Sequence, residues 1–232
     1  MPKEVPHFNN EAIAHLAMEL YGIEGEISAL VSYEDQNARI KTSDGTYVLK
    51  IANAKWAADA LAMQTEVLEH LRTVAPELSL PRVIPTLSGE TITDVDGFAV
   101  RLVTFLEGDV LGNASRSPGL YHDIGCFMGQ FSQAMQAYTH PAAHRPDDPW
   151  NLDNVIVCKA YLQEVCDENV RARIERFYEM YEKNVLPRLH DLRKSVIHGD
   201  ANEHNLLVSP DRPRRIQLTS ATNEFQKRVA SG

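Results

Sequence analysis

Three polar residues in the last quarter of the chain have a spacing typical of an active-site loop. His198, Asp200 and Asn205 form the pattern H-x-D-x-x-x-x-N between two apolar stretches, residues 196–197 and 206–208. Short strands on both sides would hold the loop at its two ends. In phosphoryl transfer, an Asp accepts or orients the proton of the attacking hydroxyl, and an Asn five residues later binds a metal ion on the phosphates. The pattern favours Asp200 as a base, Asn205 as a metal ligand and His198 as a brace; an ordinary polar loop is the alternative.

The composition is that of a globular protein and argues against two classes of partner. The 232 residues are 44% hydrophobic and 24% charged, which suits one large or two modest domains. The formal charge is -9 and no run of Lys and Arg offers a surface for nucleic acid. No apolar run approaches the ~18 residues of a membrane span, and residues 1–6 lack the apolar segment of a signal peptide. We therefore expect a soluble cytoplasmic protein with neither nucleic-acid nor membrane partners.

The cysteines do not predict a metal site or a disulfide framework. The chain has three, Cys126, Cys158 and Cys166, and their spacing matches no metal-binding pair. We interpret all three as reduced thiols, with Cys126 in the core on a helix.

The N-terminal part of the sequence predicts a helix followed by an antiparallel sheet. Residues 10–21 have apolar side chains at helical spacing and are followed by Gly22. After Gly25 the pattern changes to short alternating or β-branched runs, with Asp44-Gly45 as a hairpin turn. The expected strands are residues 26–31, 37–42 and 46–51.

Lys50 is the candidate phosphate ligand of this sheet. It lies near the end of the apolar strand 47–51, where burying an ammonium group is costly unless it meets an anion. A Lys that reaches the surface along its alkyl chain is the alternative. The next expected helix, residues 59–71, carries Glu66 beside its apolar face, so Glu66 could pair with Lys50; a solvated Glu is common. Strand Lys, helix Glu and a distant H-x-D-x-x-x-x-N is the order used by protein-kinase-like folds.

A second hairpin precedes a change to helical composition. Residues 91–95 and 98–105 flank Asp96-Gly97, and the second run leads into Glu107-Gly108. Here the backbone groups of Thr104 and Leu106 could hydrogen bond an adenine edge, and a plain linker is a compatible alternative. Two helical patterns follow, at residues 118–138 and, with a possible break, at residues 159–185.

Taken together, these residues resemble the aminoglycoside phosphotransferase and choline kinase superfamily of small-molecule kinases. Five short phrases resemble its hydroxylysine kinase branch, which includes phosphotransferase domains fused to class III aminotransferases: residues 32–37, 47–51, 105–108, 140–142 and 149–152. The resemblance covers residues 9 to about 208. It implies an α+β, two-lobed, protein-kinase-like fold. The expected lobes are residues 1–106, with an antiparallel sheet that binds nucleotide, and 107–232, an incomplete helical lobe with the catalytic loop.

The resemblance also implies roles for individual residues. Lys50 would bind the α- and β-phosphates, with Glu66 as its ion-pair partner. Asp200 would be the catalytic base and Asn205 a ligand of Mg2+. The implied reaction transfers the γ-phosphoryl group of ATP or GTP to a hydroxyl of a small amino alcohol or amino acid, such as hydroxylysine; hydroxylysine kinases favour GTP.

The sequence departs from the family after its last apolar strand. In the family, an Asp in an Ile-Asp-Phe-Gly-like phrase holds magnesium at this point, whereas residues 219–222 read Thr-Ser-Ala-Thr. The tail 219–232 has no family character, so we expect a chain truncated after about residue 218 and reduced activity, because a metal ligand is lost. Two alternatives stay open: an inactive remnant that binds a nucleotide or a partner, and a fragment of a multidomain phosphotransferase-aminotransferase.

Overall fold

The computed structural model describes residues 5–32, 35–145, 151–210, 215–219 and 226–229. The chain divides into two compact units, which are considered separately. The first consists of residues 1–134 and 200–224, and the second of residues 135–199 and 225–232. The N-terminal sheet and the loop with Asp200 and Asn205 thus belong to one unit. The expected lobe boundary at residue 106 stays a prediction.

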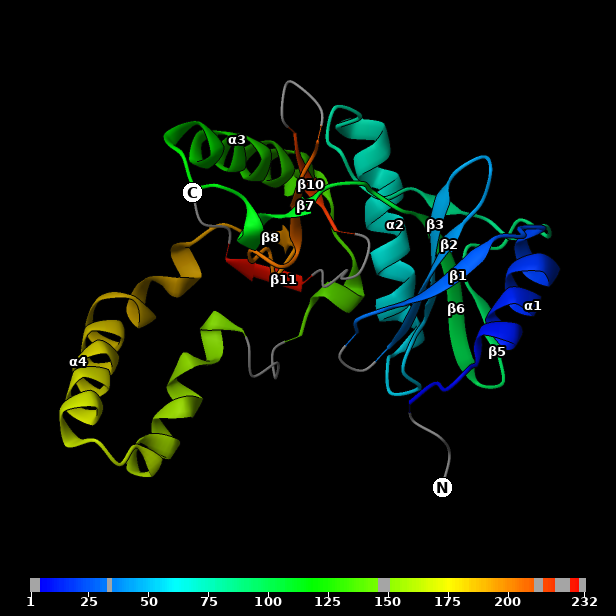
Figure 1. Cartoon of the computed structure of the whole chain (residues 1–232). Helices are drawn as coiled ribbons and strands as arrows, with labels where there is room; N and C mark the ends of the chain where they lie inside the picture. The colour runs from blue at the N-terminus through cyan, green and yellow to red at the C-terminus, as the bar shows by residue number, and fades with distance from the viewer. Residues whose placement is uncertain (1–4, 33–34, 146–150, 211–214, 220–225, 230–232) are drawn as a thin grey trace. The chain divides into compact units, whose positions relative to one another are not determined.

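A six-stranded antiparallel sheet is the centre of the first unit (Figure 1). The strand order is β1-β2-β3-β6-β4, and β5 pairs with β6. Lys50 on β3 lies opposite Asn37 on β2 and Arg101 on β6. Directly opposed residues project from the same face of a sheet, so these three form a polar row. The strands are β1 (Glu26–Leu30), β2 (Gln36–Lys41), β3 (Thr46–Ile51), β4 (Val83–Ile84), β5 (Thr93–Val95) and β6 (Phe98–Thr104).

Helix α1 (Asn10–Tyr21) covers one face of this sheet and confirms the expected helix. The Asn9 side chain accepts a hydrogen bond from the Ala12 N–H at its start, and Gly22 ends it with a φ of 66°. The buried side of α1 contacts alternate residues of the central strands, which builds the hydrophobic core of the unit. This core includes Ile13, Leu16, Ala17, Tyr21, Ile40, Leu49, Ile51, Val100 and Leu102.

Helix α2 (Ala58–Val74) lies on the other side of the sheet (Figure 1). Six of its buried residues recur at helical spacing, and Leu61 and Thr65 are buried beside them; the six are Ala60, Met63, Gln64, Val67, Leu68 and Leu71. Gln64 is a polar member of this buried row. The helix therefore brings an amide, as well as apolar side chains, to the buried side.

A small sheet completes the first unit and carries the loop. Its strands are β7 (Asp109–Val110), β9 (Leu206–Val208) and β10 (Ile216–Leu218), in the order β10-β9-β7. The turn η1 (Leu111–Asn113) and helix α3 (Pro118–Ala134) follow β7 along the chain. Helix α3 buries Leu120, Phe127 and Phe131. The expectation that Cys126 is a core residue is wrong: it is exposed, because it lies ~100° around the helix from Phe127.

The second unit contains mostly short helical segments. They are η2 (Met135–Ala137), η3 (Pro141–Ala143), η4 (Leu152–Glu164), α4 (Glu168–Asn184) and η5 (Leu186–Asp191). Strands β8 (Lys194–Ile197) and β11 (Gln226–Val229) pair antiparallel. The helical pattern at 159–185 is broken, since a 3-10 helix ends at residue 164 and Asp167 caps α4 by accepting hydrogen bonds from two backbone N–H groups. Within the described ranges, no helix combines the length and apolar character that crossing a bilayer requires.

Candidate active site

The loop between Asp200 and Asn205 is held together by its own amide groups. Asn205 Nδ2 donates to Asp200 Oδ2 over 2.7 Å and to the Asp200 carbonyl oxygen over 2.8 Å. Asn202 Nδ2 donates to Asp200 Oδ1 over 2.8 Å, and Asn202 Oδ1 accepts from the His204 N–H over 2.9 Å. Both carboxylate oxygens of Asp200 are therefore fixed by side chains of the same loop.

Strand pairing fixes the other end of the loop. Asn205 is buried, and its carbonyl oxygen accepts from the Thr219 N–H over 2.9 Å. Directly after Asn205, β9 begins and pairs with both β7 and β10. Backbone hydrogen bonds thus anchor the candidate metal ligand Asn205, as we expected from the apolar run that follows it. His198 is also buried but belongs to the second unit, so its bracing of the loop stays a prediction.

The side chains at this loop offer few ligands to a cation. Because Asn205 Nδ2 faces Asp200, Oδ1 is the atom that Asn205 could present to a metal ion. Thr219 follows β10, where the family pattern has an Asp. In the described part of the chain, no group of three or more His, Cys, Asp or Glu side chains is placed to hold a metal. The donor set suits an ion such as Mg2+, which completes its shell with phosphate oxygens and water.

The end of β6 is tied to β3 and to the residue before β4. The Thr104 N–H donates to the Arg82 carbonyl oxygen over 2.9 Å, and the Phe105 N–H donates to the Thr46 carbonyl oxygen over 2.8 Å. A contact of Thr104 with a base edge would therefore use its carbonyl oxygen. Among the described residues, neither backbone group of Leu106 is hydrogen bonded, so both are available to a ligand.

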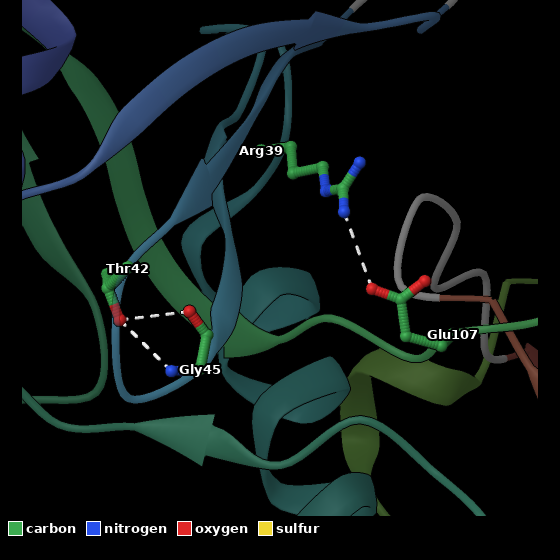
Figure 2. Close-up of polar contacts among 4 residues, drawn as sticks. All are labelled: Arg39, Thr42, Gly45 and Glu107. Atoms are coloured by element: carbon green, nitrogen blue, oxygen red, sulfur yellow. Dashed lines mark hydrogen bonds and ion pairs between the residues drawn. The ribbon is translucent and has the colours of Figure 1, made fainter.

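The same segment is held from the side of β2 (Figure 2). Arg39 donates to Glu107 Oε1 over 3.4 Å, and its guanidinium carbon lies 4.7 Å from the centre of the Phe105 ring. Directly after β2, Thr42 Oγ1 accepts from the Gly45 N–H and donates to the Gly45 carbonyl oxygen, which closes the β2-β3 turn (Figure 2). Cation–π and ionic contacts thus link residues 105–107 to the first sheet.

Residues 108–112 connect this segment with the catalytic loop inside the first unit. A Cβ atom on Gly108 would lie 2.8 Å from the Val208 carbonyl oxygen, so only glycine allows this approach. The Gly112 N–H donates to the Glu203 carbonyl oxygen over 2.9 Å. A cavity of about 450 Å³ borders the segment, and another of about 400 Å³, lined in part by Arg116 and Glu203, borders the loop.

Lys50 is buried, which excludes the alternative that it reaches the surface. Its exposed fraction is 2%. Burial, together with the positive charge of Arg101, lowers the pKa of Lys50 to about 7, although the negative charge of Asp35 opposes this. Burial therefore disfavours the charged form of this amine, and a nearby anion would favour it.

Sequence reasoning missed Arg101 and Gln64, the two buried polar residues that accompany Lys50. Arg101 is 3% exposed and donates from Nη2 to Gln64 Oε1 on α2 over 2.8 Å. Burial lowers the pKa of Arg101 to about 10, against the effect of Asp35 and then Tyr21. Glu66 on the same helix is exposed, and its pairing with Lys50 stays a prediction. The signal that could have found Arg101 is a charged residue inside the apolar run 98–105.

Comparison with solved structures defines the class of fold. The amicoumacin kinase hAmiN, in complex with AMP-PNP, Ca2+ and Ami, superposes with a TM-score of 0.68 at 15% identity over 96% of this chain and 66% of that one. A microcompartment-associated aminopropanol kinase gives a TM-score of 0.65 at 19% identity over 94% of this chain and 71% of that one. The chain therefore has the protein-kinase-like α+β fold that the sequence predicted.

Sequence comparison gives the family. The model of the phosphotransferase enzyme family matches residues 26–217, so the chain belongs to that family. Hydroxylysine kinase of Mus musculus is 29% identical over 223 residues, and that of Xenopus laevis is 31% identical over 222 residues. Each alignment covers 88% of this chain and 59% of the relative, so the chain spans about three fifths of their length. A homoserine kinase of Bartonella henselae is 26% identical over 123 residues, 49% of this chain and 36% of the relative.

Proposed function

We propose that this chain is a small-molecule kinase that transfers the γ-phosphoryl group of ATP or GTP to a hydroxyl of an amino alcohol or amino acid. The observation that carries the proposal is the carboxylate of Asp200, which Asn202 and Asn205 hold by both oxygens. A fixed carboxylate can orient the acceptor hydroxyl and accept its proton as the phosphoryl group moves.

The nucleotide is proposed to bind along β3, β6 and the segment after β6. In this arrangement Lys50 contacts the α- and β-phosphates, and Glu66 is its ion-pair partner. The carbonyl oxygen of Thr104 and the N–H of Leu106 bind the adenine or guanine edge. The availability of both Leu106 backbone groups supports this assignment. The proposed location is the cytoplasm.

Mg2+ is proposed to bind Asn205 Oδ1 together with oxygens of the nucleotide phosphates. When bound, the ion neutralises charge on the phosphates. The amide orientation of Asn205 supports this role, because its nitrogen is engaged by Asp200.

The proposed acceptor class is a small hydroxylated amine or amino acid, such as hydroxylysine. The names of three kinds of similar protein support it: hydroxylysine kinase, homoserine kinase and aminopropanol kinase. Since the chain spans 59% of the hydroxylysine kinases, the proposal goes no finer than this class.

A direct assay tests the proposal. Purified chain is incubated with Mg2+, with ATP or GTP, and with 5-hydroxylysine, ethanolamine or choline, and the phosphorylated product is measured. We expect turnover with at least one acceptor and its loss in Asp200→Ala. The matched control is Asp59→Ala, which removes an exposed carboxylate from the first turn of α2 and should keep wild-type turnover. Equal turnover in Asp200→Ala and wild type would contradict the role of Asp200.

A second candidate function is nucleotide binding without catalysis, and Thr219 favours it because no carboxylate follows β10 at that position. It predicts a folded chain with no turnover that ATP or GTP still stabilises in a thermal shift assay. Magnesium-dependent stabilisation that Asn205→Ala abolishes would support the metal assignment under either function. Equal shifts in Asn205→Ala and wild type would contradict it.

A further inference from the structure

A cavity beside the catalytic loop has walls of two kinds. It lies within the first unit and has a volume of about 400 Å³, in the range of ~300–1,000 Å³ that is usual for small-molecule sites. Leu111, Leu120 and Ile124 form its apolar wall. Arg116 and Glu203 bring one positive and one negative charge. The cavity therefore combines an aliphatic surface with two opposite charges.

The two charges of this cavity do not pair with each other. Among the described residues, neither the Arg116 guanidinium nor the Glu203 carboxylate has an ion-pair partner, although both line the same cavity. Both side chains are exposed, so water solvates them in the free protein. A guanidinium group is suited to a carboxylate because it presents parallel N–H donors, and a carboxylate is suited to an ammonium group. The lining thus matches a ligand that carries both kinds of charge.

Short hydrogen bonds tie the acidic side of the cavity to the proposed catalytic carboxylate. Asn202 Nδ2 donates to Asp200 Oδ1 over 2.8 Å, and Asn202 Oδ1 accepts from the N–H of His204, which also lines the cavity, over 2.9 Å. Glu203 lies between these bonded residues, and its carbonyl oxygen accepts from the Gly112 N–H over 2.9 Å. The backbone that carries Glu203 is therefore fixed, three positions from Asp200.

The start of helix α3 fixes the basic side of the cavity. Ser117 follows Arg116; its Oγ accepts from the Leu120 N–H over 3.1 Å, and its carbonyl oxygen accepts from the Tyr121 N–H over 3.1 Å. Leu120 is 4% exposed and anchors this turn in the core. Arg116 therefore extends from an ordered backbone, on a different element from Glu203.

We propose that this cavity is the acceptor subsite for a hydroxylated amino acid, in which Glu203 binds the ammonium group beside the reacting hydroxyl and Arg116 binds the carboxylate. Glu203 is assigned to the reacting end because it lies in the same loop as Asp200, whose carboxylate would meet the hydroxyl. The apolar wall accommodates the aliphatic chain between the charged ends. This inference rests on the proposed function, and it favours an amino acid over an amino alcohol as the acceptor.

Calorimetry measures acceptor binding without requiring turnover. 5-Hydroxylysine and its primary amide, which lacks the negative charge of the carboxylate, are titrated into the wild-type chain in the presence of ADP and Mg2+. We expect the amide to bind about tenfold more weakly, which corresponds to the loss of one charge-assisted hydrogen-bonded pair. Equal Kd values for the two ligands would overturn the carboxylate contact. Absence of 5-hydroxylysine binding would overturn the subsite as a whole.

A variant series attributes each contact to its residue. Arg116→Gln should raise the Kd of 5-hydroxylysine about tenfold and leave that of the amide unchanged, whereas Glu203→Gln should weaken the binding of both ligands. Arg72→Gln and Glu11→Gln are the matched controls, because each removes a charge of the same sign from an exposed site outside the cavity. Both controls should keep the wild-type Kd. If Arg116→Gln weakens the binding of acid and amide equally, the carboxylate contact is refuted.

Turnover separates this inference from the proposed function. If the chain phosphorylates 5-hydroxylysine and Arg116→Gln keeps the wild-type KM, the subsite is wrong and the kinase assignment stands. If the wild-type chain binds 5-hydroxylysine through Arg116 but gives no turnover, the subsite stands and the kinase assignment fails.

Discussion

Replacing Lys50 by methionine is expected to stabilise the folded chain, and the gain should shrink as pH rises. The change keeps a long, unbranched side chain and removes an ionisable group that is 2% exposed. The pKa of Lys50 is lowered from 10.5 to about 7. A difference of one pKa unit between the folded and unfolded states corresponds to about 1.4 kcal/mol. Protonation of Lys50 in the unfolded state therefore favours unfolding by on the order of 4 kcal/mol at pH 7.

The sign follows from which state binds more protons. Between pH 7 and 10.5 the unfolded chain binds a proton at Lys50 that the folded chain does not. Lowering the pH through this window therefore favours the unfolded state, and raising it stabilises the wild type. The free energy of unfolding of Lys50→Met lacks this contribution to its pH dependence, because methionine does not titrate. From pH 7.5 to 9.5, its advantage over wild type should fall by about 3 kcal/mol.

Urea denaturation monitored by circular dichroism at pH 7.5, 8.5 and 9.5 measures this difference. The matched control is Lys55→Met, which removes an exposed Lys five positions along the chain and should follow the wild-type pH profile. An advantage of Lys50→Met that stays constant across this range would refute the reasoning, because it would mean that Lys50 binds its proton equally in both states.

Four further changes test other parts of the structure. Asn202→Ala should lower kcat on the order of tenfold with little change in nucleotide KM, as measured by steady-state kinetics, because the Asp200 carboxylate loses one of its two side-chain donors. Gly108→Ala should cost about 1–3 kcal/mol of stability in urea denaturation, since its Cβ would lie 2.8 Å from a carbonyl oxygen. Phe131→Ala should cost about 3–5 kcal/mol in the same assay, because this core side chain is fully buried. Glu66→Gln should raise the calorimetric nucleotide Kd by about fivefold or less, because the carboxylate is exposed in the free chain.

Local signals predicted the elements whose determinants lie within a few residues. Helix α1 has the predicted bounds because its apolar spacing, the Asn9 cap and Gly22 all agree. The β5-β6 hairpin turns at Asp96-Gly97, where both residues have positive φ, as this dipeptide predicts. The hydrogen bond from Asn205 to Asp200 is also local, because it joins residues only five positions apart.

Contacts between distant segments were less accessible from sequence. The two strands beside the catalytic loop were both predicted, but β8 pairs with β11 whereas β9 pairs with β7 and β10, in separate sheets. No local pattern states which strands pair. The hydrogen bond from Arg101 to Gln64 likewise joins residues 37 positions apart and depends on how α2 packs against the sheet.

The burial of Gln64 rather than Glu66, by contrast, follows from the helical period of α2. The buried row of α2 begins with Ala60 and Met63, and positions i, i+3, i+4 and i+7 from Ala60 include residue 64 but not residue 66. Glu66 lies outside this row and is exposed. The geometry places the amide on the buried side instead.

The polar row across the first sheet has a cost in stability that an apolar row would avoid. A β-branched or aliphatic residue at position 50 or 101 would match its buried neighbours and avoid the cost of desolvating a cation. Gln64 offers Arg101 a hydrogen bond but no charge, so α2 does not neutralise the pair through it. The gain in stability measured with Lys50→Met should therefore report the cost of burying the Lys50 amine.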